Sequence, residues 1–189
     1  MANKNDTDQK LASAFKSLLE ERSFDNITIN DICERSGTSR RNFYRHFKDK
    51  YDLMCWIYQE EFCIPVFEMQ VPHFADLMPL ICKYWYENKA FMLHALEVKG
   101  PNSLREFSIK RVTPYLLKDY GSAFDESIDV KPLISELVEF GHNMLFNWLK
   151  GNPNIGPEEY SNLFLSMMIN VSSSMYSLMK KPAEESENV

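Results

Sequence analysis

The sequence predicts an all-α fold with a small three-helix N-terminal head and a larger helical body. Only 6 of the 189 residues are glycine, while Leu, Met, Glu and Lys, which favour helices, are frequent. Apolar residues recur at intervals of three and four, the period of an amphipathic helix. A capped turn around residue 37 is typical of a helix-turn-helix unit. We therefore divide the chain into residues 1–55, 56–182 and a charged tail, 183–189, that we expect to be disordered.

The first two helices of the head follow from local signals. An amphipathic helix is expected over residues 7–22 because four apolar residues share one face: Leu11, Phe15, Leu18 and Leu19. The second helix begins at Thr28, whose hydroxyl can cap the first turn while Asp31 takes the reciprocal position of a capping box. It ends at Gly37, which can take the positive φ that a sharp turn needs. The sequence thus places a tight turn between the second helix and the next.

The third helix carries an unusual concentration of positive charge. Thr38 or Ser39 is expected to cap it, with Phe43 and Phe47 one turn apart on its inner face. Residues 35–50 hold six basic residues and one acidic residue, a net charge of +5, whereas the rest of the chain holds 15 basic and 26 acidic residues, a net of −11. One positive site on an acidic body suits a protein that contacts nucleic acid through one element. From charge alone, a solvated basic helix face remains the alternative.

The capped glycine turn together with the basic helix favours DNA binding. The N-terminal end of a recognition helix enters the major groove, where Arg pairs with guanine and Asn with adenine. The residues expected at base edges are Ser39, Arg40, Arg41 and Asn42. Those expected at phosphates are Tyr44, His46 and Lys50, and the full expected DNA-binding set adds Thr28, Thr38 and Arg45.

Residues 28–53, TINDICERSGTSRRNFYRHFKDKYDL, resemble the DNA-binding signature of the tetracycline-repressor (TetR) family. The residues that match this signature are Thr28, Gly37, Phe43, Tyr44, His46, Phe47, Lys50 and Leu53. The resemblance covers about residues 8–58 and implies an all-helical homodimer whose C-terminal domain senses a signal. Thr38, Arg41 and Asn42 depart from the commonest form of the signature, so no operator sequence carries over. Residues 53–62, LMCWIYQEEF, are more weakly similar to a branch that includes the dihydroxyacetone-kinase operon regulator, some members of which act through a partner protein.

The body is expected to consist of a fourth helix over residues 49–69 and further helices after it. Pro65 is expected to kink or end the fourth helix. Glycine, asparagine and proline clusters separate the remaining helices, which we place at about 74–87, 89–98, 102–119, 131–150 and 157–180.

The last two helices are expected to form a dimer interface, because the family resemblance implies a four-helix interface from such a terminal pair. The residues assigned to it are Leu137, Phe140, Met144, Trp148, Met167, Val171 and Ser174. From periodicity alone, the same apolar stripes are equally consistent with the core of a single chain.

A ligand pocket in the body is a weaker expectation. The aromatic and histidine residues assigned to it are Trp85, Phe91, His94, Phe107, Tyr115 and His142, all of which can equally be core residues. The four Cys and four His lack metal-ligand spacing, and a thiol sensor at Cys63 is an alternative with little support. No cofactor is expected, and no catalytic motif recommends an enzyme.

The expected function is therefore that of a cytoplasmic, sequence-specific transcriptional regulator. The chain has no apolar run long enough to span a membrane and its first residues are too polar for a signal peptide. The expected partners are an operator in double-stranded DNA, a second copy of the chain, and either a small effector or a second regulatory protein. A homodimeric repressor released by an effector is the first interpretation. A coactivator that docks on DNA and works through a protein partner is the alternative.

Overall fold

The computed structural model describes residues 4–124, 127–151 and 154–179. These residues form an all-helical fold without β-strands, as predicted. The helices of the head and the linking region are α1 (Lys4–Glu21), η1 (Phe24–Asn26), α2 (Ile29–Ser36), α3 (Arg40–His46), α4 (Lys50–Tyr58), η2 (Gln59–Cys63) and α5 (Ile64–Glu68). Those of the body are α6 (Phe74–Glu87), α7 (Lys89–Glu97), α8 (Leu104–Tyr120), η3 (Gly121–Ala123), α9 (Lys131–Lys150) and α10 (Pro157–Met179). The tail expected over 183–189 lies outside the described residues.

The local signals in the head produce the expected turn. The Thr28 hydroxyl accepts from the backbone N–H of Asp31, whose carboxylate accepts from the Thr28 N–H, so the capping box is present. Gly37 ends α2 with φ +66°, a left-handed conformation that costs residues with a Cβ free energy. Ser39, one of the two expected caps, accepts from the N–H of Asn42 at the start of α3. The two short helices are therefore fixed in a helix-turn-helix arrangement.

The head and the body share one apolar core. α1 packs against α2 in the head, against α4 of the linking region and against α7 of the body. Leu53, Met54 and Ile57 of α4 are fully buried and continue the core from the head into the body. The proposed domain division at residue 55 falls inside this helix and remains a proposal.

The expected fourth helix, over residues 49–69, contains a π-helical turn. It runs as α4, η2 and α5, with the N–H of Ile64 bonded to the carbonyl of Gln59, five residues earlier. Pro65 follows directly. A proline lacks an N–H and its ring collides with the carbonyl four residues before it, so widening the preceding turn lets the helix continue. Pro65 therefore does not end the helix.

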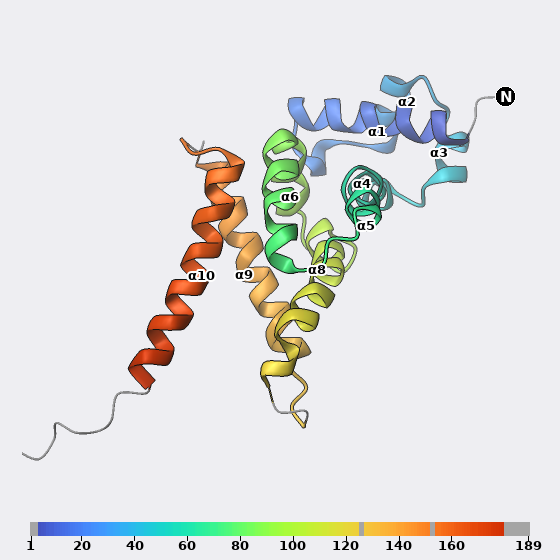
Figure 1. Ribbon diagram of the computed structural model, residues 1–189. Helices are drawn as coiled ribbons and strands as arrows, with labels where there is room; N and C mark the ends of the chain where they lie inside the picture. The colour runs from blue at the N-terminus through green and yellow to red at the C-terminus, as the bar shows by residue number, and fades with distance from the viewer. Residues whose placement is uncertain (1–3, 125–126, 152–153, 180–189) are drawn as a thin grey trace, which may run out of the picture.

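The long helices of the body pack in pairs. α8 lies against α9, and α10 lies against α6. Figure 1 shows α10 diverging from α9 along its length, so that its C-terminal half extends beyond the other helices. Within the described ranges, no helix is long and apolar enough to cross a membrane.

Candidate nucleic-acid interface

α3 presents its basic side chains to solvent because its phenylalanines face inward. Phe43 and Phe47 are buried, with ring centroids 5.9 Å apart. On the remaining faces Arg40, Arg41 and Arg45 are exposed. The helix is thus anchored by aromatic packing on one side and carries three guanidinium groups on the other.

Five of the expected DNA-binding residues lie together around a hollow on the surface of the head. We call it the head concavity, and it is lined by Thr7, Lys10, Ser36, Gly37, Thr38, Ser39, Arg41, Asn42 and Arg45. Its wall combines the N-terminal part of α1, the turn at Gly37 and the first turns of α3. Within the part of the chain that the structure describes, no carboxylate lies within ion-pair distance of Arg41 or Arg45. Both guanidinium groups are therefore available to an external anion.

Arg35 contributes less positive charge to this surface than the sequence suggests. Its guanidinium forms two hydrogen bonds of 2.8 Å with the two carboxylate oxygens of Glu21, and a third of 2.8 Å with the Ser17 hydroxyl. The hydrogen bond from Arg35 holds the pKa of the Glu21 carboxyl below its ordinary value. Arg35 therefore ties α2 to α1, and the free charge is concentrated on α3.

Arg40 and Tyr44 form an exposed pair one turn apart on α3. Arg40 Nη2 lies 3.4 Å from the Tyr44 hydroxyl, and the guanidinium carbon lies 5.9 Å from the centre of the ring. The Tyr44 side chain is 50% exposed. This pair lies outside the head concavity, beside it on the same helix.

His46 has a partner within the head, which the sequence did not suggest. Its Nδ1 lies 2.6 Å from a carboxylate oxygen of Asp8 in α1. Because a carboxylate only accepts hydrogen bonds, the imidazole donates here. Both side chains are about 10% exposed, at 10% for His46 and 11% for Asp8. His46 thus joins α3 to α1, and its expected phosphate contact is not what this geometry favours.

Lys50 is likewise engaged inside the protein. Its ammonium donates to the backbone carbonyls of Phe24 at 2.8 Å and Ile27 at 2.9 Å, and lies 4.3 Å from the centre of the Phe24 ring. Burial lowers the pKa of this ammonium group. Lys50, at the start of α4, therefore holds the segment between α1 and α2 in place. A phosphate contact would use its remaining proton or break these bonds.

Thr28 has its hydroxyl committed to the capping box. The hydroxyl donates to the Asp31 carboxylate at 2.7 Å and accepts from the Asp31 N–H.

Sequence reasoning missed Thr7 and Lys10, which face α3 across the head concavity. No local signal marked either residue. Lys10 forms an ordinary helical ion pair with Asp6, at 2.7 Å. Their position depends on how α1 packs against α2.

The residues expected to line one ligand pocket are distributed over different parts of the body. Trp85 and Phe91 are core residues, at 0% and 3% exposure. His94 lines a hollow beside the α1–α2 link, and Phe107 lines one between α4 and α8. Tyr115 lines a groove beside η2. Helical periodicity sends these side chains in different directions, so the single site expected from the sequence is not assembled.

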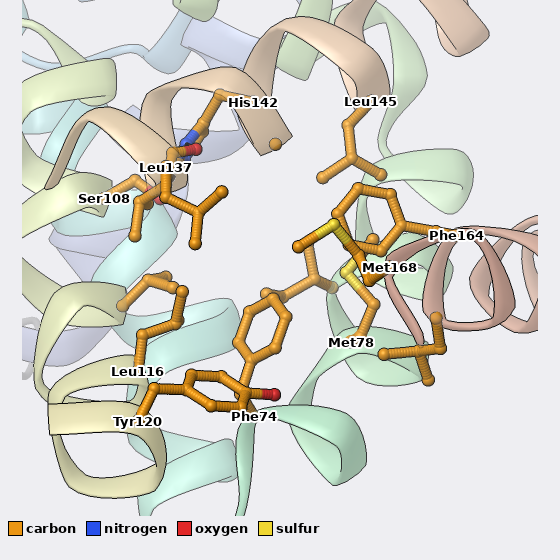
Figure 2. A pocket seen from close by; sticks show the side chains of 15 residues that line it. Phe74, Met78, Ser108, Leu116, Tyr120, Leu137, His142, Leu145, Phe164 and Met168 are labelled. Carbon is orange, nitrogen blue, oxygen red and sulfur yellow. Dashed lines mark hydrogen bonds between the residues drawn. The ribbon is translucent and has the colours of Figure 1, made fainter. Parts of the chain in front are cut away.

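His142 does line a cavity, between α6, α8, α9 and α10. Figure 2 shows it beside Ser108 at one end of this cavity, with Phe74 and Tyr120 together at another. The cavity measures about 70 Å³. An apolar cavity of about 150 Å³ is known to admit benzene, so this one is too small for most organic ligands as it stands.

The buried imidazole of His142 is held by two hydrogen bonds. Nδ1 donates to the carbonyl of Val138 at 2.8 Å, and Nε2 accepts from the Ser108 hydroxyl at 2.8 Å. Burial lowers the pKa of His142 to about 4, aided by the charge of Arg105. The imidazole is therefore neutral at physiological pH.

The residues assigned to a dimer interface differ in exposure. Phe140 and Val171 are both 52% exposed, whereas Trp148 is buried and stacks on Tyr160 with ring centroids 4.3 Å apart. Ser174 is exposed, while Leu137, Met144 and Met167 are half-buried. Leu137 also lines the cavity around His142. Trp148 thus packs within the protomer, and Phe140 and Val171 are the best placed of the set to meet another chain.

Cys63 is not an activated thiol. Burial raises its pKa to about 11, although the charge of Arg111 acts to lower it, so the thiol is protonated at neutral pH. The alternative of a thiol sensor gains no support from the structure.

Comparison with known proteins identifies the head. A family model described as "Bacterial regulatory proteins, tetR family" matches residues 11–54, which include all of the helix-turn-helix unit. A regulator from Staphylococcus aureus (strain bovine RF122 / ET3-1), named as an HTH-type transcriptional regulator, is 25% identical over 172 residues, covering 85% of this chain and 91% of that protein. The head of the chain, residues 11–54, is that of the TetR family. The chain is a DNA-binding transcriptional regulator and not an enzyme.

Two further similarities concern the head of this chain and its fold. The dhaKLM operon transcriptional activator DhaS of Lactococcus lactis is 30% identical over 56 residues, which span only 30% of either protein. The solved structure of a dihydroxyacetone kinase operon activator of the same name superposes with a TM-score of 0.62 at 16% identity, over 87% of this chain and 94% of that one. A putative TetR-family regulator from Syntrophomonas wolfei gives 0.64 at 17% identity, over 90% and 97%. At these identities the structures support the fold alone.

Proposed function

We propose that this TetR-family regulator is a homodimeric repressor that binds an operator through α3 and is released by an effector bound to its body. The observation that supports the DNA contact is the head concavity, where Arg41 and Arg45, which have no ion-pair partner among the described residues, flank Asn42. Arg41 and Asn42 are in the first turn of α3, which enters the major groove in helix-turn-helix proteins. Arg40, Tyr44 and the residues at the rim then contact phosphates.

A homodimer accounts for the apolar side chains exposed on α9 and α10. Isolated exposed apolar residues are ordinary, but several on two consecutive helices are typical of an interface. The exposed residues on these helices are Leu133, Phe140, Leu163, Ile169, Val171 and Met175, with exposed fractions between 52% and 65%. Pairing α9 and α10 of two chains as a four-helix interface would bury them and place two heads on one duplex.

Activation of transcription is the alternative to repression. DhaS, similar to this chain over the head, is named an activator, which keeps open a coactivator that docks on DNA and recruits a protein. In vitro transcription with purified protein and a duplex carrying its site separates the two. A repressor lowers transcript yield without any added partner, whereas a coactivator changes the yield only when cell extract is supplied. In either case the site of action is the bacterial cytoplasm, where the DNA lies.

DNA binding through the head concavity is tested by its dependence on salt. Arg45→Ala should weaken binding to all duplexes alike and reduce the slope of log affinity against log salt by about 1, because one phosphate contact is lost. Lys131→Ala, at an exposed position on the body, serves as the control and should leave the slope unchanged. An unchanged slope for Arg45→Ala would remove this residue from the interface.

A further inference from the structure

The groove beside η2 lies against the helix that links head and body. We call it the η2 groove. It is lined by Tyr58, Gln59, Phe62 and Cys63 from the linking helix, and by Arg111 and Tyr115 from α8. Its volume is about 300 Å³, more than four times that of the cavity around His142. That volume is at the lower end of what small-molecule sites occupy, about 300–1,000 Å³.

Most of the η2 groove is apolar, with one charged group. The aromatic rings of Phe62 and Tyr115 line it, and Phe67, with 77% of its side chain exposed, lies at its edge. Among the residues that the structure describes, Arg111 is the one charged residue in its wall. Across the described residues no carboxylate approaches this guanidinium within ion-pair distance. Its guanidinium carbon lies 5.0 Å from the centre of the Phe107 ring, a cation–π contact that leaves the charge of the group in place.

A second polar group in the wall lacks a partner. The Oε1 atom of Gln59 is buried, and the structure shows no hydrogen-bond donor for it among the described residues. A buried oxygen without a donor costs free energy, and such groups are commonly satisfied by a water or a ligand. Gln59 is also the first residue of the π-helical turn, a feature that occurs often at functional sites.

We propose that the η2 groove binds the effector, and that the effector is a small acid with an apolar, preferably aromatic, body and a hydroxyl or amide donor. The guanidinium of Arg111 pairs with its carboxylate, a geometry that its planar fork fits better than an ammonium group would. The rings pack against the apolar body, and Gln59 accepts from the donor. One cation in the wall matches a single carboxylate and not a polyphosphate.

The same π turn connects the η2 groove to the head. Glu61 accepts from Lys16 of α1 at 2.8 Å and from the hydroxyl of Tyr84 in α6 at 3.0 Å. Lys16 also donates to Asn88 at 2.9 Å. A ligand that displaces Gln59 and Phe62 therefore moves Glu61, which lies between them and binds Lys16 of α1. The binding site stands by itself, whereas this effect on DNA rests on the proposed release by an effector.

The experiment uses 6-hydroxy-2-naphthoate as the probe and isothermal titration calorimetry of the full chain without DNA. Two analogues separate its groups: 6-hydroxy-2-naphthamide lacks the charge and 2-naphthoate lacks the hydroxyl. The wild type should bind the probe more tightly than either analogue. Arg111→Gln should weaken probe binding by about tenfold or more, since a charge-assisted pair is lost, and should abolish the preference over the amide. Gln59→Leu should abolish the preference over 2-naphthoate.

Lys110→Gln is the matched control, because Lys110 is exposed on the same helix and lines a different hollow. It should bind the probe as the wild type does, and circular dichroism should show all variants folded. Absence of probe binding to the wild type, or equal binding to wild type and Arg111→Gln, would overturn the site. If binding depends on Arg111 but saturating probe leaves the affinity for DNA unchanged, the site holds and its role in release is refuted.

Discussion

Replacing His142 should make the stability of the protein less sensitive to mild acid. The folded protein holds the pKa of His142 at about 4, against 6.5 for an unperturbed histidine. The unfolded chain therefore binds a proton more readily between these values, and the stability contributed by the neutral imidazole is complete above pH 6.5 and falls as the pH drops toward 4. The difference of 2.5 pH units limits the loss to about 3 kcal/mol, and about 2 kcal/mol is lost by pH 5.

His142→Gln removes the titration while keeping a side chain that can both donate and accept hydrogen bonds. Urea denaturation of both proteins at pH 7.5 and pH 5.0 gives the change in unfolding free energy for each. We expect the wild type to lose about 2 kcal/mol more than the variant over this interval. The subtraction cancels the other three histidines. Equal losses in the two proteins would show that burial does not hold His142 neutral.

Three further substitutions test individual contacts. Gly37→Ala should destabilise the head by about 1 kcal/mol, because the left-handed φ of +66° disfavours a Cβ even though no described atom lies within 4 Å of it; thermal unfolding measures this, and Gly37→Asn should lose less. Lys50→Ala should cost about 1–2 kcal/mol in urea unfolding through its two carbonyl bonds, and exposed Lys48→Ala should cost almost nothing; equal stability of the two variants would contradict the role of Lys50. Phe140→Glu should give monomers in sedimentation velocity while Met69→Glu, directly after α5, stays dimeric, and a Phe140→Glu dimer would place the interface elsewhere.

The parts of the head that the sequence predicted are those determined by neighbouring residues. The Thr28 capping box, the Gly37 turn and the inward pair Phe43 and Phe47 each depend on contacts within a few positions, so their spacing is enough. The sequence did not show which of the expected DNA-binding residues face solvent and which hold the head together. Basic residues look alike in sequence, and only the folded chain shows that Lys50 turns inward while Arg41 stays free.

The parts that the sequence did not predict depend on contacts between distant segments. The pairs His46–Asp8 and Lys16–Glu61 join residues 38 and 45 positions apart, and no local pattern marks them. The π turn before Pro65 arises where a proline must be accommodated in a helix that packing keeps continuous. The prediction of a single ligand pocket in the body was wrong for a related reason. Aromatic residues close in sequence point to different faces of their helices.

The reading of bases by α3 is tested most directly by selecting bound sequences from random duplex DNA. The wild type should recover a two-fold symmetric site with half-sites about one helical turn, roughly 34 Å, apart. Arg41→Ala should recover the same site with the preference at one base pair of each half-site lost, at a cost of about 1–3 kcal/mol on the wild-type site, and Asn42→Ala should relax an adenine. Identical sites from the wild type and both variants, or no common site from the wild type, would contradict sequence reading by this helix.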